Sequence, residues 1–209
     1  MKKIITVQHT QSIHHINGMV GSWTDWDLTE KGIRQAENIG ARLAGELEEE
    51  EVKIYSSDLL RAKHTADIIA HHLGSEVIVR ENLRERNLGI AVGKSVQWLR
   101  ENMECKEKTV DDRMFSDAES KRDVWNRLES FFAEMMSDEE TTTLIIVSHG
   151  DTLSVFNTMF LGLDVEALNK GELFGMAAGV SIMYITDDGR HTIRRLSDMS
   201  YSHFDDGAL

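Results

Sequence analysis

Residues 3–9 read Lys-Ile-Ile-Thr-Val-Gln-His, a short run rich in β-branched residues that ends abruptly in polar side chains. Residues 143–150 follow the same pattern as Thr-Leu-Ile-Ile-Val-Ser-His-Gly. Near-continuous apolar runs of this length are typical of strands that are buried on both faces of a parallel sheet. The two stretches therefore predict neighbouring core strands, each followed directly by a histidine.

Amphipathic helical patterns alternate with these strands along the chain. Thr29 and Ser120 stand where helix N-caps are expected, and Gly74 stands where a helix should end. Asp188-Gly189 is a strong hairpin signal near the C-terminal end. The sequence predicts an α/β fold of three layers: a mostly parallel sheet, helices on both faces and an antiparallel hairpin at one edge. Strands are expected at residues 3–7, 52–55, 76–79, 143–147, 180–186 and 192–196.

Composition narrows the class of protein. The chain has 209 residues, 41% of them hydrophobic, and 23 basic against 36 acidic side chains give a net charge of −13. Such an acidic chain is a poor ligand for nucleic acid or anionic membranes. The single cysteine excludes an internal disulfide and a multi-cysteine zinc module. Without a recognisable leader or membrane span, we expect a soluble, cytoplasmic protein.

We expect one domain over residues 1–209, with a short cap insertion around residues 94–118 and a mobile tail from Tyr201 to Leu209. The insertion is polar and charged. The oligomeric state is left open by the sequence.

Polar residues follow the expected strands at the edge where α/β folds bind ligands. Gln8 and His9 follow the first strand, Arg61 lies in the first turn after the second, Glu85 follows the third, and His149 follows the fourth. A neutral imidazole is a good nucleophile, and a phosphoryl transition state requires positive charge and hydrogen-bond donors on its oxygens. Arginine offers a two-pronged donor, and a carboxyl group can protonate the leaving oxygen. This set predicts phosphoryl transfer that needs no metal and no cofactor.

The same residues resemble the histidine phosphatase superfamily, whose best-known branch is the cofactor-dependent phosphoglycerate mutases. The resemblance spans nearly the whole chain, and its parts occur in the family's order. Besides His9 they are Gly21-Ser22-Trp23-Thr24-Asp25, Leu28-Thr29-Glu30-Lys31-Gly32, Gln35-Ala36, Tyr55-Ser56-Ser57-Asp58-Leu59-Leu60-Arg61-Ala62, Thr65-Ala66, Leu83-Arg84-Glu85, Gly89, Gly93, Glu119-Ser120, Val124, Arg127 and Val147-Ser148-His149-Gly150.

The resemblance implies a two-step transfer in which His9 becomes a phosphohistidine. Arg61 and His149 match the family's phosphate ligands, and Glu85 matches its proton donor. Ser12 lies where the family often has a serine or threonine near the phosphate.

The chain departs from the family at the first strand end, where Gln8-His9-Thr10 replaces Arg-His-Gly, and at His15, where the family often has a phosphate-binding asparagine. Gln8 can donate hydrogen bonds but carries no charge. Relative to the arginine of the family, the lost charge costs about one kcal/mol, or roughly tenfold in phosphate affinity or rate. We expect Gln8 and His15 to contact the phosphate, with His14 and His15 restoring charge at mildly acidic pH.

Three functions remain open. The first is a phosphomonoester hydrolase, which the short cap favours because water can reach the phosphohistidine. The second is a non-catalytic protein that binds a phosphorylated ligand or partner, and the third is a phosphoglycerate mutase. A metal cluster of His9, His14 and His15 is disfavoured because no carboxylate or cysteine stands at a suitable spacing. The expected substrate is a phosphorylated small molecule, selected by residues 87–108 and 174–179.

Overall fold

The structure is a computed structural model and describes residues 1–48, 50–138 and 140–203. Within them the strands form one six-stranded sheet in the order β3-β2-β4-β1-β5-β6. The pairs β1–β4, β2–β4 and β2–β3 are parallel, and β5 runs antiparallel to β1 and β6. The predicted sheet with its antiparallel edge hairpin is confirmed. The strands are β1 (Lys2–Gln8), β2 (Val52–Ser56), β3 (Val77–Val79), β4 (Thr143–Ser148), β5 (Val180–Ile185) and β6 (His191–Asp198).

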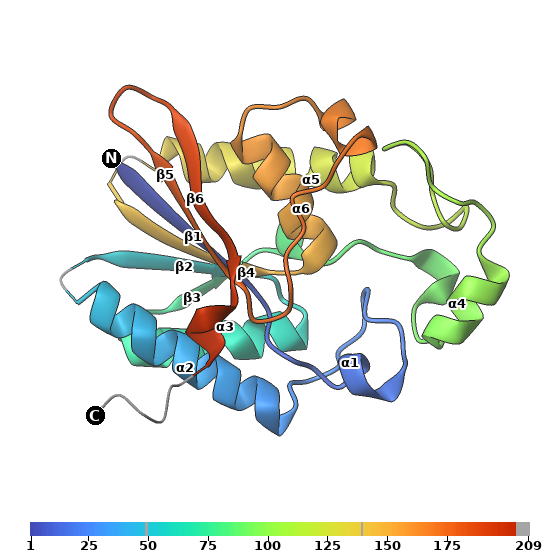
Figure 1. The fold of residues 1–209 in the computed structure, drawn as a ribbon, viewed down its shortest axis with the longest axis horizontal. Coiled ribbons are helices and arrows are strands. Elements are labelled where there is room, and N and C mark those ends of the chain that lie inside the picture. Colours follow the sequence, from blue (N-terminus) through green and yellow to red (C-terminus); the bar gives the residue numbers. More distant parts are fainter. Residues whose placement is uncertain (49, 139, 204–209) are drawn as a thin grey trace.

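Helices cover both faces of this sheet (Figure 1). On one face α2 (Glu30–Glu46) and α3 (Leu60–Leu73) pack on Ile5 and Val7 of β1. On the other face α5 (Lys121–Ser137) and α6 (Gly150–Phe160) pack on Ile4. Successive side chains of a strand point to opposite faces, so a continuous apolar run supplies both cores. The three-layer architecture is confirmed.

The predicted helix ends have local causes. The Thr29 hydroxyl accepts a 3.0 Å hydrogen bond from the Gly32 amide at the start of α2. Ser120 and Asp123 form a capping box at the start of α5. Gly74 ends α3 with φ of 61°, a left-handed conformation that glycine adopts without strain. Each cap satisfies backbone groups that the helix itself leaves free.

Two features differ from the sequence prediction. A one-turn helix, α1 (His14–Asn17), follows β1, where the sequence analysis predicted no helix. The tail expected from Tyr201 to Leu209 is wrong at its start, because Tyr201 is buried in η4 (Met199–Ser202), a 3₁₀ turn packed against α2. Arg42 Cζ lies 3.8 Å from the centroid of the Tyr201 ring, and this cation–π contact holds the 3₁₀ turn against α2. Residues 204–209 lie outside the described residues.

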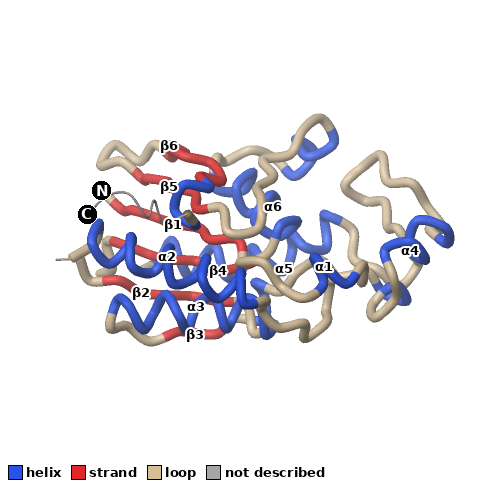
Figure 2. Tube along the Cα trace, turned by 60° about the horizontal axis from the view of Figure 1, so that its bottom comes forward, coloured by secondary structure: helices blue, strands red, loops and turns tan. Residues whose placement is uncertain are grey.

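The polar segment after β3 contains η1 (Glu81–Leu83), η2 (Gly89–Ala91) and α4 (Val96–Asn102). Figure 2 shows α4 at one end of the molecule, away from the sheet. This end has its own apolar cluster, in which Trp98 stacks on Phe115 at 5.8 Å between ring centroids. Another 3₁₀ turn, η3 (Val165–Asn169), follows α6.

None of the helices in residues 1–48, 50–138 and 140–203 combines the length and the apolar character that a bilayer crossing requires.

Candidate active site

Two adjacent parallel strands carry the two strand-end histidines to the same edge of the sheet. Gln8 of β1 is in register with Ser148 of β4, so His9 and His149 follow side by side. Their ring centroids are 5.1 Å apart, and both side chains are buried. Arg61, in the first turn of α3, reaches the same point and is only 1% exposed. The structure thus brings together three residues that the strand-end rule singled out.

Hydrogen bonds determine which nitrogen of His9 carries a lone pair. Nδ1 lies 2.9 Å from the Thr10 carbonyl oxygen, which can only accept a hydrogen bond. Nδ1 therefore carries the proton. On the other side of the ring, Arg61 Nε donates to Nε2 across 3.2 Å. The lone pair of His9 is therefore on Nε2, where it accepts the Arg61 hydrogen bond.

Two backbone carbonyls hold the Arg61 guanidinium in place. Its terminal nitrogens donate to the carbonyl oxygens of Ser22 and Thr24, each at 2.8 Å. A guanidinium has five N–H groups, and three of them are used by His9, Ser22 and Thr24. Among the described contacts two N–H groups remain, and they are available to an oxyanion.

His149 is held from one side only. Its Nε2 lies 2.9 Å from the Ser57 hydroxyl. Its Nδ1 is buried and has no hydrogen-bond partner among the described residues. A buried polar atom without a partner is costly, and such atoms are common where a ligand completes the contact. Nδ1 of His149 is therefore a candidate ligand contact beside the His9 ring.

The electrostatics keep these imidazoles neutral. Burial and the Arg61 charge lower the pKa values of His9 and His149 well below the usual range. Burial also lowers the pKa of Arg61 to about 10, so the guanidinium stays charged at neutral pH. Burial, His15 and Arg61 lower the pKa of His14 to about 3, and that of His15 is lowered by burial and Arg61. These shifts oppose the gain of charge by His14 and His15 that was expected at mildly acidic pH.

Glu85 lies after β3 and turns its carboxylate toward α6. Its Oε1 accepts from the Arg86 amide at 2.9 Å and from the Thr152 amide at 3.3 Å. The Trp23 indole donates to the Glu85 carbonyl oxygen at 2.6 Å, which ties this segment to the loop that holds Arg61. Burial and the neighbouring Asp151 charge raise the pKa of the Glu85 carboxyl. This shift favours the protonated form that a general acid requires.

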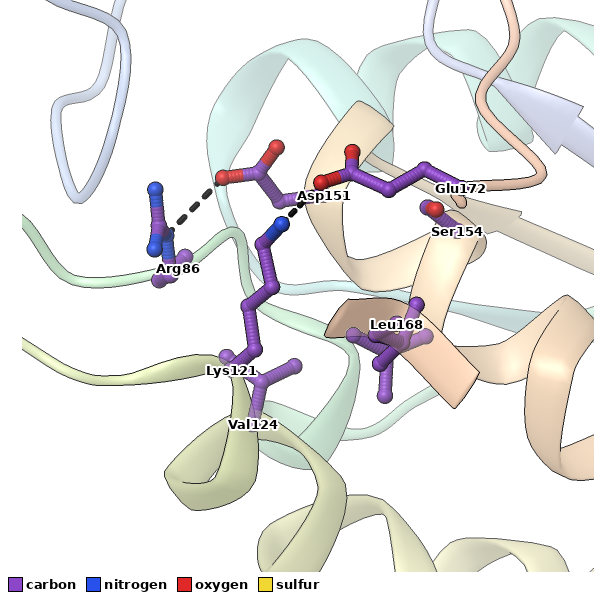
Figure 3. Close-up of a pocket in the computed structure, with 8 residues that line it drawn as sticks. Arg86, Lys121, Val124, Asp151, Ser154, Leu168 and Glu172 are labelled. Atoms are coloured by element: carbon purple, nitrogen blue, oxygen red, sulfur yellow. Dashed lines mark hydrogen bonds and ion pairs between the residues drawn. The ribbon is translucent and has the colours of Figure 1, made fainter. Parts of the chain in front are cut away.

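A charged group behind Glu85 was not predicted from the sequence. The buried Arg86 side chain pairs with Asp151 at 2.9 Å and with Glu107 at 2.6 Å. Figure 3 shows the Arg86–Asp151 pair at one side of a small cavity and a Lys121–Glu172 pair at the other. Glu107 belongs to the expected cap, so this contact joins the cap to the segment that carries Glu85. The only sequence signal is the position of Asp151, directly after His149-Gly150.

The loop after β1 supplies three further polar residues. Ser12 is buried and uses its hydroxyl to contact His14 Nδ1, while its amide donates to His15 Nδ1 at 3.0 Å. The His15 ring stacks on His9 with 5.4 Å between centroids. The nearest ring nitrogens of His9, His14 and His15 all lie within 4.8 Å of one another. The predicted residue His15 therefore lies beside His9, Ser12 lies beside His14 and His15, and their phosphate contacts remain a prediction.

The two departures at the first strand end have different surroundings. A side chain added at Gly150 or Gly175 would lie 3.4–3.5 Å from the Gln8 amide, and Gln8 Oε1 is buried without a partner among the described residues. The predicted contact of Gln8 with phosphate remains untested.

Thr10 has no positive φ, and its amide donates to the Thr65 hydroxyl at 3.2 Å. A glycine is therefore not required for the backbone conformation at position 10.

The chain is similar to known proteins over most of its length. The model of the histidine phosphatase superfamily (branch 1) matches residues 4–198. A probable phosphoglycerate mutase GpmB from Erwinia tasmaniensis is 29% identical over 171 residues, which cover 80% of this chain and 78% of the relative. A 2,3-bisphosphoglycerate-dependent phosphoglycerate mutase from Bartonella tribocorum is 29% identical over 195 residues, covering 88% and 91%.

Solved structures share the fold. A mycobacterial glucosyl-3-phosphoglycerate phosphatase in complex with VO₃ superposes with a TM-score of 0.80 at 22% identity, covering 95% of this chain and all of the other. A putative α-ribazole-5′-P phosphatase from Escherichia coli also has a TM-score of 0.80, at 21% identity, with coverage of 95% and 98%. Both similarities concern the fold.

Proposed function

This chain belongs to the histidine phosphatase superfamily, and from that membership and the strand-end geometry we propose that it is a phosphomonoester hydrolase acting through a phosphohistidine at His9. The observation that carries the proposal is the buried contact between Arg61 Nε and His9 Nε2 at 3.2 Å. It places the lone pair of a neutral imidazole beside a fixed cation that still has N–H groups to donate. Nucleophile and oxyanion ligand therefore meet at one point.

The first step transfers the phosphoryl group to the protein. The hydrogen bond from Arg61 Nε to His9 Nε2 breaks, Nε2 attacks phosphorus, an N–P bond forms, and the P–O bond to the leaving group breaks. Glu85 gives its proton to the leaving oxygen. The free Arg61 N–H groups and Nδ1–H of His149 donate to the phosphoryl oxygens, where negative charge must be stabilised.

The second step restores the enzyme. Ionised Glu85 takes a proton from water as the water oxygen attacks phosphorus, and the N–P bond breaks. Inorganic phosphate leaves, and His9 regains its lone pair. We propose that no metal and no cofactor take part, that the substrate is a phosphorylated small molecule, and that Ser12, His15 and Gln8 add contacts to its phosphate.

The uncharged Gln8 favours a second candidate, a non-catalytic protein that binds a phosphorylated ligand or partner. A phosphoglycerate mutase is a third, since relatives bear that name. We place hydrolysis first because the cap insertion expected around residues 94–118 is short, and a short cap favours access of water to the phosphohistidine.

A panel of phosphomonoesters, assayed with and without EDTA, tests the proposal. We expect phosphate release that EDTA does not reduce, and acid-labile label on the protein from a ³²P-labelled substrate. His9→Ala should abolish both, and His71→Ala, on the remote end of α3, should abolish neither. Label that persists in His9→Ala contradicts the mechanism. Phosphate binding without turnover supports the non-catalytic alternative, and transfer between the hydroxyls of phosphoglycerate supports the mutase.

A further inference from the structure

Three histidines meet at the end of β1, although only one of them is needed as a nucleophile. The ring centroids of His14 and His15 are 4.0 Å apart, and those of His9 and His14 are 5.7 Å apart. Their nearest nitrogens lie within 4.8 Å of one another. The sequence argued against a metal here because it lacks a carboxylate or cysteine at a suitable spacing. The fold supplies three imidazoles instead, and imidazole alone is sufficient for zinc.

Two of these three rings contact an oxygen atom through Nδ1, as metal-binding histidines commonly do. Such histidines commonly donate their other N–H to an oxygen atom, which orients the ring. Nδ1 of His9 donates to the Thr10 carbonyl, and Nδ1 of His14 contacts the Ser12 hydroxyl. These contacts leave Nε2 of His14 without a hydrogen-bond partner among the described residues, whereas Nε2 of His9 accepts from Arg61.

Two contacts must change when a metal enters. Arg61 Nε donates to His9 Nε2, so a metal ion on this nitrogen must break this hydrogen bond and lie beside the guanidinium charge, which weakens its binding. His15 is exposed, so its ring has room to release the Ser12 amide and turn. Zinc–nitrogen bonds of about 2.0–2.1 Å place tetrahedral ligands about 3.4 Å apart, so the rings must approach by roughly an ångström. We therefore expect weaker binding than at a structural zinc site.

We propose that His9, His14 and His15 form a site for a divalent transition metal such as Zn²⁺, and that the metal inhibits the protein by occupying the nucleophilic nitrogen of His9. The inhibitory part rests on the proposed function, whereas metal binding does not. The ion is coordinated by lone pairs and no electron is transferred. Metal and phosphorus compete for the same Nε2.

Metal binding is tested without any assay of activity. Co²⁺ is titrated into the full chain at pH 7 while the visible d–d absorption is recorded, and Zn²⁺ is then added to displace it. We expect one equivalent per chain and a spectrum of a nitrogen-bound ion. His14→Gln and His15→Asn should each weaken binding by about tenfold or more. His71→Asn is the matched control on α3 and should change nothing.

The inhibitory arm measures phosphate release with and without Zn²⁺, relative to the zinc-free rate of each variant. We expect reversible inhibition that EDTA relieves and that His15→Asn reduces. Absence of stoichiometric binding, or binding that survives both His14→Gln and His15→Asn, overturns the site. Binding without inhibition overturns the inhibitory role. A chain that binds Co²⁺ through these residues but hydrolyses no phosphoester retains the site and contradicts only the proposed hydrolase.

Discussion

The candidate active site has two parts that are built differently. The strand-end floor consists of His9, Arg61 and His149, which are buried and positioned by backbone carbonyls and strand register. The acid wall consists of Glu85, Arg86, Glu107 and Asp151, in which ion pairs hold Arg86 between two carboxylates. In the proposed mechanism the floor sets the geometry of the reacting atoms, whereas the wall sets the protonation of the acid. Substitutions in the two parts should therefore have different signatures.

The largest effect should come from the floor. Arg61→Lys removes the Nε donor to His9 and the fork that the Ser22 and Thr24 carbonyls orient, and an ammonium group does not replace them. We expect kcat/KM to fall by about 10²–10³. Arg42→Lys, a surface arginine paired with Glu46, is the control. A folded Arg61→Lys variant with unchanged kcat/KM would remove Arg61 from the proposed mechanism.

Gln8→Arg tests whether the floor extends to position 8. An added charge at the phosphate should raise the affinity for phosphate or vanadate by about tenfold. The measurement is the inhibition constant of each anion. An unaltered constant would mean that position 8 faces Gly150 and Gly175 rather than the anion.

Asp151→Asn should change the pH profile rather than the geometry. Burial and Asp151 raise the pKa of Glu85, so the proton donor stays protonated to higher pH. Removing the Asp151 charge lowers this pKa, and the high-pH limb of kcat should move to lower pH. The profile is measured beside Asp188→Asn, an exposed control in the β5–β6 turn. A high-pH limb that stays in place, or that moves to higher pH, contradicts the role of the acid wall.

Glu107→Gln should have the smallest effect. It neutralises one of the two partners of the buried Arg86 and leaves the strand-end floor intact. We expect kcat to fall by about two- to fivefold, or roughly 0.4–1 kcal/mol, with little change in KM. Steady-state kinetics separate the two constants, and Glu104→Gln in the same segment is the control. A loss as large as that of Arg61→Lys would show that the two parts do not act separately.

The floor was predictable from the sequence because it depends on periodicity and chain order. Apolar runs locate β1 and β4, and parallel neighbours must present His9 and His149 at one edge. Arg61 follows from its place in the first turn after β2. None of these inferences requires knowledge of how side chains pack.

The acid wall was not predictable, since it forms only where a polar segment folds back on the sheet. Nothing in the spacing of Arg86, Glu107 and Asp151 reveals that they meet. The same holds for Tyr201, whose burial depends on the Arg42 and Glu46 side chains of α2. Long-range contacts of this kind depend on tertiary packing rather than local propensity.

The strand order also constrains how the molecule folds. Arg61 contacts His9 across 52 positions of the chain, and His149 contacts Ser57 across 92. Pairing distant segments costs loop-closure entropy before the stabilising contacts form, and this slows folding. During synthesis, an emerging chain that ends before β4 already contains His9 but lacks the central strand against which β1 and β2 dock. Activity should therefore appear late and all at once.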